Sequence, residues 1–329
     1  MSEYKPEVWA TRGLLDQFCG INKRMEDRAF AFILGAGASV PSGIEAGAKL
    51  VDRWLHELKE RLCQNDSQTL AEWATAENLD IEGFDFANAV NFYPQVFERR
   101  FRDHQEEGFA YLELEMEGKE PSIGYSVLSK ILAQTRHKVV ITTNFDNLVA
   151  DALAIYSDKH PLVAGHESLS GFVSTRPRRP LVAKIHRDLY LAPINDPGVN
   201  SLKAGWERAL KKLFEHYTPI VIGYGGNDGS LMELLRGLPE GSIPGGIFWC
   251  HRKDKPPTDE RILKAVAKQH GKLVPIIGFD EFMMELGERL GYPPLEGGAG
   301  TAGKGACGAL SRTVRGDTAA HRKGEQWHG

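Results

Sequence analysis

Six short runs of apolar residues constrain the fold of this chain more than any other feature of its sequence. They cover residues 30–35, 138–143, 181–186, 219–224, 246–251 and 273–278. In each run several consecutive residues are apolar, whereas a strand with one solvent-exposed face would alternate apolar and polar residues. Strands buried on both faces of a parallel sheet have this pattern, so we expect the six runs to form such a sheet.

Segments with the apolar spacing of a helix separate most of these runs. Residues 146–156 and 203–217 have this periodicity, and so do residues 48–62. In the last of these segments the apolar stripe consists of Leu50, Val51, Trp54, Leu55, Leu58 and Leu62. Because strands and helices alternate, the sequence predicts an α/β fold, a Rossmann-like doubly wound parallel sheet of about six strands.

The spacing of the runs also predicts the domain organisation. About a hundred residues separate the first two strands, far more than one crossover helix needs. Residues 64–118 are charged and rich in phenylalanine, and we interpret them as a helical insertion after the first strand. Their aromatic side chains would form the core of the insertion rather than a partner surface. Residues 1–29 form an N-terminal segment, and the glycine-rich residues 293–329 are expected to be a disordered tail, the remnant of a truncated or frame-shifted chain.

Charge, hydropathy and residue spacing exclude several classes of protein. Forty Lys and Arg against 44 Asp and Glu give a net charge of −4, which argues against nucleic-acid binding through bulk charge. No apolar run has the roughly 18 residues of a membrane helix, and the N-terminus lacks the pattern of a secretory signal. The four cysteines form no CxxC pair, so we expect a cytoplasmic protein without a zinc ribbon. The histidines show no metal-ligand spacing, and no metal is expected.

The first predicted strand runs into the glycine-rich turn 35–39, Gly-Ala-Gly-Ala-Ser. A turn of this kind before a helix suits a phosphate, because backbone N–H groups and the helix dipole converge there. Val40 stands where the dehydrogenase fingerprint needs a third glycine, and no Gly-Lys-Ser/Thr follows as in a Walker-type loop. Both of these nucleotide-binding classes are therefore disfavoured, and the turn alone is a weak signal.

Three further strands end in polar or glycine-rich sequence. Asn144 and Asp146 follow the second strand, His186 follows the third, and residues 223–228 (Gly-Tyr-Gly-Gly-Asn-Asp) follow the fourth. The carboxyl ends of parallel strands form the crevice in which α/β sheets bind ligands. Taken singly, Asn144 or Asp146 could cap the next helix, and His186 could be a core residue rather than a general base. Four such strand ends in one chain favour a site.

Together these motifs resemble the bacterial sirtuin-like family, of the NADase type that lacks a zinc ribbon. GAGAS with PSGI, TTNFDN, KIHRDL, GYGGND and FWCHR follow one another in the family's order between residues 30 and 292. The resemblance implies that residues 30–292 are an NAD-binding domain with the catalytic residues Asn144 and His186, the latter as the base. The residues that it implies for NAD binding are Gly35, Ala36, Gly37, Ser39, Asp146, Gly223, Gly225, Asn227 and Asp228.

The resemblance implies cleavage of the nicotinamide–ribose bond of NAD+, with NAD as the substrate. Protein deacylases of the wider family carry a zinc domain with two CxxC pairs, which this sequence lacks. We therefore expect an NAD+ hydrolase that forms ADP-ribose and nicotinamide, as in antiphage defence. An NAD-dependent protein deacylase or ADP-ribosyltransferase, a non-catalytic NAD or ADP-ribose sensing module, and a structural scaffold are the alternatives.

The same resemblance carries expectations about partners. It implies a cytoplasmic homo-oligomer that works with a separate sensor or a HerA-type ATPase, since no sensor module is visible in the sequence. Neither membrane association nor direct nucleic-acid binding is expected. Arg187 stands where the family usually has a glycine after the histidine, which could narrow an acyl-substrate channel.

Overall fold

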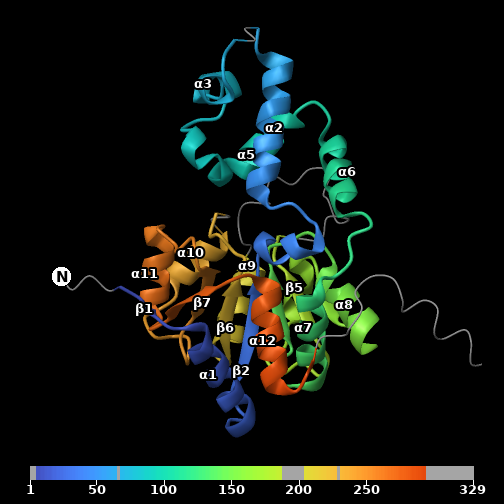
Figure 1. Ribbon diagram of the computed structural model, residues 1–329, viewed down its shortest axis with the longest axis vertical. Coiled ribbons are helices and arrows are strands. Elements are labelled where there is room, and N and C mark those ends of the chain that lie inside the picture. Colours follow the sequence, from blue (N-terminus) through green and yellow to red (C-terminus); the bar gives the residue numbers. More distant parts are fainter. Residues whose placement is uncertain (1–4, 65–66, 187–203, 228–229, 294–329) are drawn as a thin grey trace, which may run out of the picture. The chain divides into compact units, whose positions relative to one another are not determined.

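Eight strands pair in parallel in one sheet, in the order β1-β8-β7-β6-β2-β3-β5-β4 (Figure 1). The computed structural model describes residues 5–64, 67–186, 204–227 and 230–293. The strands are β1 (Glu7–Val8), β2 (Ala29–Leu34), β3 (Val139–Thr142), β4 (Leu162–Ala164), β5 (Leu181–Lys184), β6 (Tyr217–Ile222), β7 (Phe248–Arg252) and β8 (Lys272–Ile276).

The predicted α/β, Rossmann-like class is confirmed, and each of the six predicted runs overlaps a strand. The strand count was too low by two. β1 and β4 are two and three residues long and lie at the two edges of the sheet. Segments this short have no recognisable periodicity, and only pairing with a neighbouring strand makes them part of the sheet.

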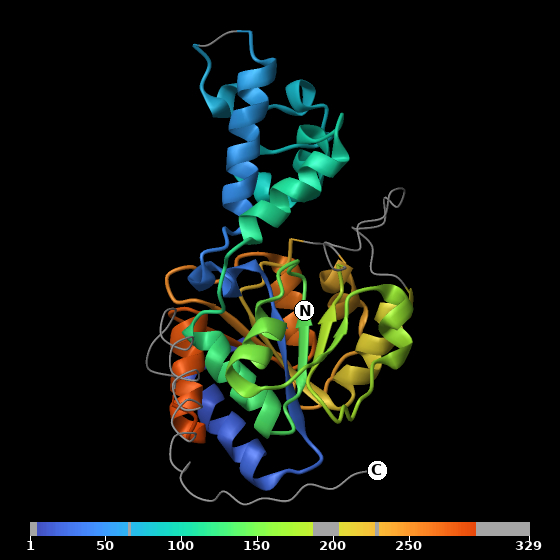
Figure 2. The same ribbon diagram turned by 90° about the vertical axis from the view of Figure 1, so that its right-hand side faces the viewer.

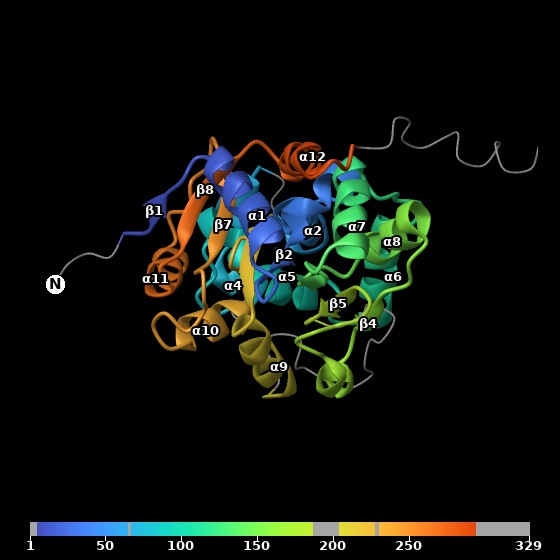
Figure 3. The ribbon, with the colours of Figure 1, turned by 90° about the horizontal axis from the view of Figure 1, so that it is seen from below.

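Helices cover both faces of the sheet, as Figure 3 shows. Alternate residues of β2 enter two separate apolar clusters, Phe30 and Phe32 on one face and Ala31 and Ile33 on the other. The first face is covered by α1 (Thr11–Arg24), α7 (Ile123–Gln134), α8 (Leu148–Ser157) and α12 (Phe279–Leu290). The second is covered by α9 (Ala204–Phe214), α10 (Ser230–Gly237) and α11 (Glu260–Lys268). The sheet is therefore doubly wound.

A third apolar cluster belongs to a helical lobe inserted between β2 and α7 (Figure 2). Its helices are α2 (Gly47–Leu62), α3 (Leu70–Trp73), α4 (Ala76–Leu79), α5 (Tyr93–Arg100) and α6 (Gln105–Met116), with the 3₁₀ helix η3 (Phe86–Phe92). Trp54 is fully buried at the centre, with four aromatic rings at centroid distances of 5.1 to 6.1 Å. The phenylalanines of the insertion thus build its own core.

The lobe begins earlier than residue 64, because the stripe of α2 packs into the lobe core and not against the sheet. Periodicity identifies an apolar face but not the surface that it meets. Leu62, expected on the same apolar stripe, lies at the end of the helix and is 43% exposed, so it is not part of the buried stripe.

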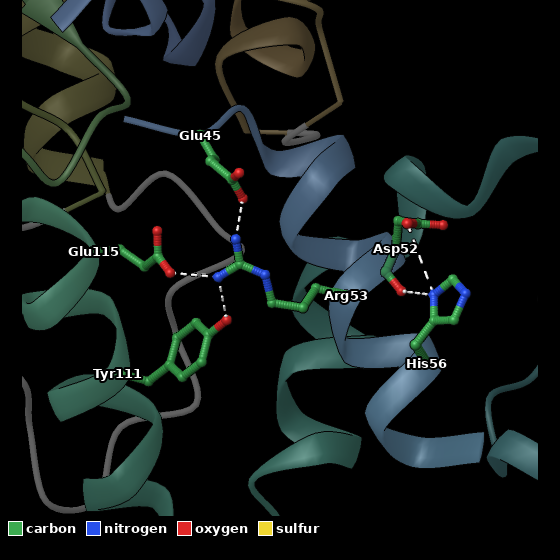
Figure 4. Close-up of polar contacts among 6 residues, drawn as sticks. All are labelled: Glu45, Asp52, Arg53, His56, Tyr111 and Glu115. Carbon is green, nitrogen blue, oxygen red and sulfur yellow. Dashed lines mark hydrogen bonds and ion pairs between the residues drawn. The ribbon is translucent and has the colours of Figure 1, made fainter. Parts of the chain in front are cut away.

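Arg53 of α2 forms hydrogen bonds with the chain segment before α2 and with α6 (Figure 4). Its guanidinium donates to Tyr111 Oη over 2.7 Å and to Glu115, both on α6, and to Glu45, which precedes α2. One turn further along α2, the His56 ring contacts the carbonyl of Asp52 in its own helix. The guanidinium therefore joins the chain entering the lobe to the helix that leaves it.

Residues 294–329, nearly all of the predicted tail, lie outside the described residues. Of the helices in the described ranges, none combines the length and apolar character needed to cross a membrane.

His137, two residues before β3, is a buried neutral histidine. Its Nδ1 accepts the N–H of Phe30 over 2.9 Å, so Nε2 carries the proton, and Nε2 has no hydrogen-bond partner among the described residues. The rings of Phe18 and Phe30 lie 4.5 and 5.5 Å from its own. Burial, aided by the neighbouring charge of Arg136, lowers the pKa of His137 to about 3.

This histidine predicts a loss of stability in mild acid. Its folded-state pKa lies below its ordinary value of 6.5, so the unfolded chain binds the proton first and stability falls as the pH drops below 6.5. The expected slope is about 1.4 kcal/mol per pH unit. Urea unfolding at pH 7.5, 6 and 5 should show a smaller acid loss for His137→Gln than for the wild type. The exposed His56→Gln should behave as the wild type, and an equal loss in all three proteins would contradict the prediction.

Candidate functional site

The last residues of four neighbouring strands lie in one row across the sheet. Leu34 of β2 pairs with Thr142 of β3 on one side and with Ile222 of β6 on the other. Thr142 in turn pairs with Lys184 of β5. The predicted site residues follow directly on these strands, so the parallel register brings the four motifs to one edge of the sheet.

The glycine-rich turns after β2 and β6 are packed against each other backbone to backbone. Gly37 N donates to Gly223 O over 2.9 Å, and Gly35 N donates to Ile222 O over 3.1 Å. A Cβ on Gly35 would lie 2.5 Å from Tyr224 Cα. One on Gly223, whose φ is +69°, would lie 2.3 Å from the amide nitrogen of Ala38. These three glycines are required for the packing of the two turns.

The expectation that a helix follows the first turn directly is wrong. The turn itself contains a 3₁₀ helix, η1 (Ala36–Ala38), a second one, η2 (Val40–Ser42), follows it, and the next α-helix belongs to the lobe. The N–H groups of Gly35, Gly37, Ala38 and Ser39 already donate to backbone carbonyls. No α-helix dipole therefore points at this turn to favour a phosphate. Phosphate binding by residues 35–39 stays a prediction.

Ser39 joins the first and second strand ends. Its hydroxyl donates to Asp146 Oδ2 over 2.7 Å and accepts from Asn144 Nδ2 over 2.9 Å. Asn144 Nδ2 also lies 3.1 Å from Gly35 O. Because the serine proton is used on Asp146, the hydroxyl of Tyr125, 3.3 Å away on α7, is the donor in its contact with Ser39. The predicted residues Ser39, Asn144 and Asp146 thus form one network.

Asp146 is a carboxyl group whose surroundings pull its pKa in two directions. Burial raises the pKa, and this is the largest effect. The hydroxyl of Ser39, the N–H of Leu148 at 3.2 Å and the charge of Lys184 favour the ionised form. Burial also raises the pKa of Tyr125, and the nearby Asp146 contributes to that rise. Tyr125 therefore acts as a neutral hydrogen-bond donor.

His186 lies two residues beyond the end of β5, as Asn144 does beyond β3. Its Nε2 is 2.9 Å from the hydroxyl of Ser230, the first residue of α10. Ser230 is buried and His186 is partly exposed, so the hydroxyl orients a ring that solvent can reach. This orientation suits a general base.

The motif after the fourth strand lies at the same edge, but only its first glycine packs against the first turn. Gly223 is packed into the first turn, whereas Gly225 and Asn227 are exposed, and in the described ranges no hydrogen bond joins them to Ser39. Asp228 and Arg187 lie outside the described residues. The NAD contacts expected of Gly225 and Asn227 stay predictions.

The structure adds residues that the motifs did not single out. Lys184 Nζ donates to Phe145 O over 2.8 Å and to Asn147 Oδ1 over 2.7 Å, which ties β5 to the turn after β3. Lys184 and Asn147 stand inside quoted motifs, so the sequence contained a signal for them. Tyr125 had none, because it reaches the site from a helix beyond the lobe. Within the described ranges, no group of His, Cys, Asp and Glu is placed to hold a metal ion.

A small cavity of about 10 Å³ lies among these side chains, enough for one water molecule. Its polar lining consists of Tyr125, Thr142, Asn144, Asp146, Asn147 and Lys184. A dinucleotide needs several hundred Å³, so this cavity lies beside the proposed nucleotide site and does not constitute it.

The lobe is linked to the site at two places. Phe145, between Asn144 and Asp146, packs against the apolar cluster of the lobe. Where the chain leaves the lobe, Ser122 N donates to Ser42 Oγ over 2.9 Å, and Ser122 Oγ donates to Asp280 of α12. The segments that carry Ser39 and Tyr125 are therefore fixed on either side of the insertion.

Gly223→Ala is expected to destabilise the protein by at least about 2 kcal/mol, from the positive φ and the contact with Ala38 N. Gly118→Ala is the matched control, since its φ is +67° and no atom would lie within 4 Å of the new Cβ. Gly118→Ala should lower the free energy of unfolding by about 1 kcal/mol, because only the positive φ disfavours alanine there. Urea unfolding measures both. Equal costs would show that the two turns separate easily.

Ser39→Ala is expected to cost about 1–3 kcal/mol, because it removes the donor to buried Asp146 and the acceptor for Asn144. Ser126→Ala is the control, a buried serine whose hydroxyl, among the described residues, bonds only to Ile123 O in its own helix. Its unfolding free energy should stay within about 0.5 kcal/mol of the wild type. Similar values for the two variants in thermal or urea unfolding would contradict a specific role of the Ser39 network.

Comparison with known proteins identifies the central part of the chain. A family model described as a SIR2-like domain matches residues 138–271, which run from β3 almost to β8. The matched segment contains Asn144 and His186, and it excludes the lobe and the turn 35–39. No curated protein matches the chain. The match supports a sirtuin-like domain with an NAD-related function over residues 138–271.

Proposed function

We propose that this protein is an NAD+ hydrolase that cleaves the nicotinamide–ribose bond and releases ADP-ribose and nicotinamide. The observation that carries the proposal is the arrangement at the ends of β3 and β5. Ser39 holds Asn144 and Asp146 in one network, and an oriented histidine, His186, follows the strand beside it. The match of residues 138–271 to the SIR2-like domain family supports NAD+ as the substrate.

The chemistry needs few protein groups. As nicotinamide departs with the electron pair of the C–N bond, positive charge develops on the ribose. The buried amide of Asn144 can bind ribose hydroxyls without adding charge, and its fixed position lowers the cost of reorganisation. His186, oriented by Ser230, can take the proton from a water molecule as that water attacks the anomeric carbon. Asp146 can accept a hydrogen bond from the nicotinamide carboxamide.

The proposal extends to the biological setting. The sequence has no pair of CxxC motifs, which supports hydrolysis over transfer of an acyl group to or from a protein. We propose an antiphage-defence effector in the cytoplasm, a homo-oligomer whose NAD+ depletion is triggered by a separate sensor or a HerA-type ATPase. In infected cells that express the chain, NAD+ should then fall, and it should not fall with His186→Ala.

The direct test is nicotinamide release from NAD+ by the purified chain. Asn144→Ala and His186→Ala should each lower turnover by about 100-fold or more, the usual contribution of a positioned catalytic group. Asn88→Ala and His56→Ala, both in the lobe, are matched controls and should keep wild-type turnover. Far-UV circular dichroism establishes that each variant is folded.

Other outcomes point to the alternatives. Deacetylation of an acetylated peptide, or ADP-ribosylation of a protein, would favour the transferase class. NAD+ binding without turnover, with and without a partner ATPase, would favour a sensing module. Absence of both binding and turnover would reject the proposed NAD+ site.

A further inference from the structure

Lys184 is a buried cation at the centre of the site. It is the last residue of β5, only 1% of the residue is exposed, and it pairs with Thr142 in the row of strand ends. An ammonium group removed from water is costly unless hydrogen bonds and an opposite charge compensate it. The fold must therefore supply both near this position.

The hydrogen bonds come from the turn that carries the site residues. Lys184 Nζ donates to Phe145 O and to Asn147 Oδ1, the residues on either side of Asp146. Asp146 and Lys184 also line the same small cavity. The geometry thus places the ammonium group against the turn on both flanks of the carboxylate.

The charges around Asp146 come from three elements. Lys184 of β5 is the cation, Tyr125 of α7 is neutral, and Asp151 of α8 is a further acid. Burial raises the pKa of Asp146 and that of Asp151, and the charge of Lys184 opposes the rise at both carboxyls.

We propose that Lys184 is a positioning residue of the NAD+ site: its ammonium group fixes the turn 144–147 and balances the buried negative charge of Asp146. This inference rests on the proposed function for its role in the reaction. An ionised Asp146 accepts a hydrogen bond from an amide N–H of the substrate, whereas a protonated one has lost part of that capacity. The same lysine fixes the backbone on which Asn144 stands.

The test is a titration of Asp146 that does not depend on turnover. Aspartate labelled with ¹³C at the carboxyl carbon is incorporated, and the resonance absent from Asp146→Asn is assigned to Asp146. In the wild type this carboxyl should be ionised at pH 7. In Lys184→Met its titration midpoint should rise by about one pH unit or more, as expected when an opposite charge is removed. Lys184→Gln keeps a donor without the charge and should show the same rise.

Lys138→Met is the matched control. Its Nζ also donates to a backbone carbonyl, that of Arg178, but it lies beside the opposite end of β3. It should leave the Asp146 midpoint unchanged. An unchanged midpoint in a folded Lys184→Met or Lys184→Gln would overturn the proposal. A midpoint above pH 7 in the wild type would also overturn it, and this measurement needs no Lys184 variant.

A second readout links the residue to the reaction. If the chain cleaves NAD+, kcat/KM should fall in acid with a pH midpoint that follows the titration of Asp146. This midpoint should move to higher pH in Lys184→Gln and should not change in Lys138→Met. A purely structural role would reduce the amount of folded protein without moving this midpoint. If the wild type does not cleave NAD+, the proposed function fails, while the titration still decides the role of Lys184.

Discussion

The backbone contact between the turns after β2 and β6 is the constraint on which the rest of the site depends. Gly35 and Gly37 lie against Gly223 so closely that a side chain on any of them would overlap the facing backbone. This contact fixes where the chain leaves β2, and therefore where Ser39 stands. Ser39 in turn holds Asn144 and Asp146. The glycines thus position the polar residues through the backbone, and the carbonyl of Gly35 also accepts a hydrogen bond from Asn144.

The site also concentrates charge in a small volume. Asp146, Lys184 and the neutral Tyr125 face one cavity of about 10 Å³, and each polar group has its partners in the surrounding turns. Buried charges are tolerated only when paired and hydrogen-bonded, so the arrangement resists small displacements. A rigid polar site of this kind suits a reaction in which charge develops on the substrate and solvent must be kept away.

The inserted lobe is part of this arrangement. It departs from the chain just after η2 and returns just before α7, so the segments bearing Ser39 and Tyr125 flank it. Arg53 joins its entering and leaving segments, and Phe145 packs against its core. A large insertion at this point therefore does not separate the two halves of the site.

The sequence by itself determined the fold class, the six main strands and the strand ends that carry Asn144, Asp146 and His186. Runs of apolar residues and polar residues at their ends are local features, and local patterns are what a sequence displays. The tertiary structure alone decided that α2 packs into the lobe, that β1 and β4 complete the sheet, that Tyr125 joins the site, and that the Lys184 ammonium group bonds to the turn after β3. Each of these depends on contact between segments far apart in the chain, and only the folded backbone sets those distances.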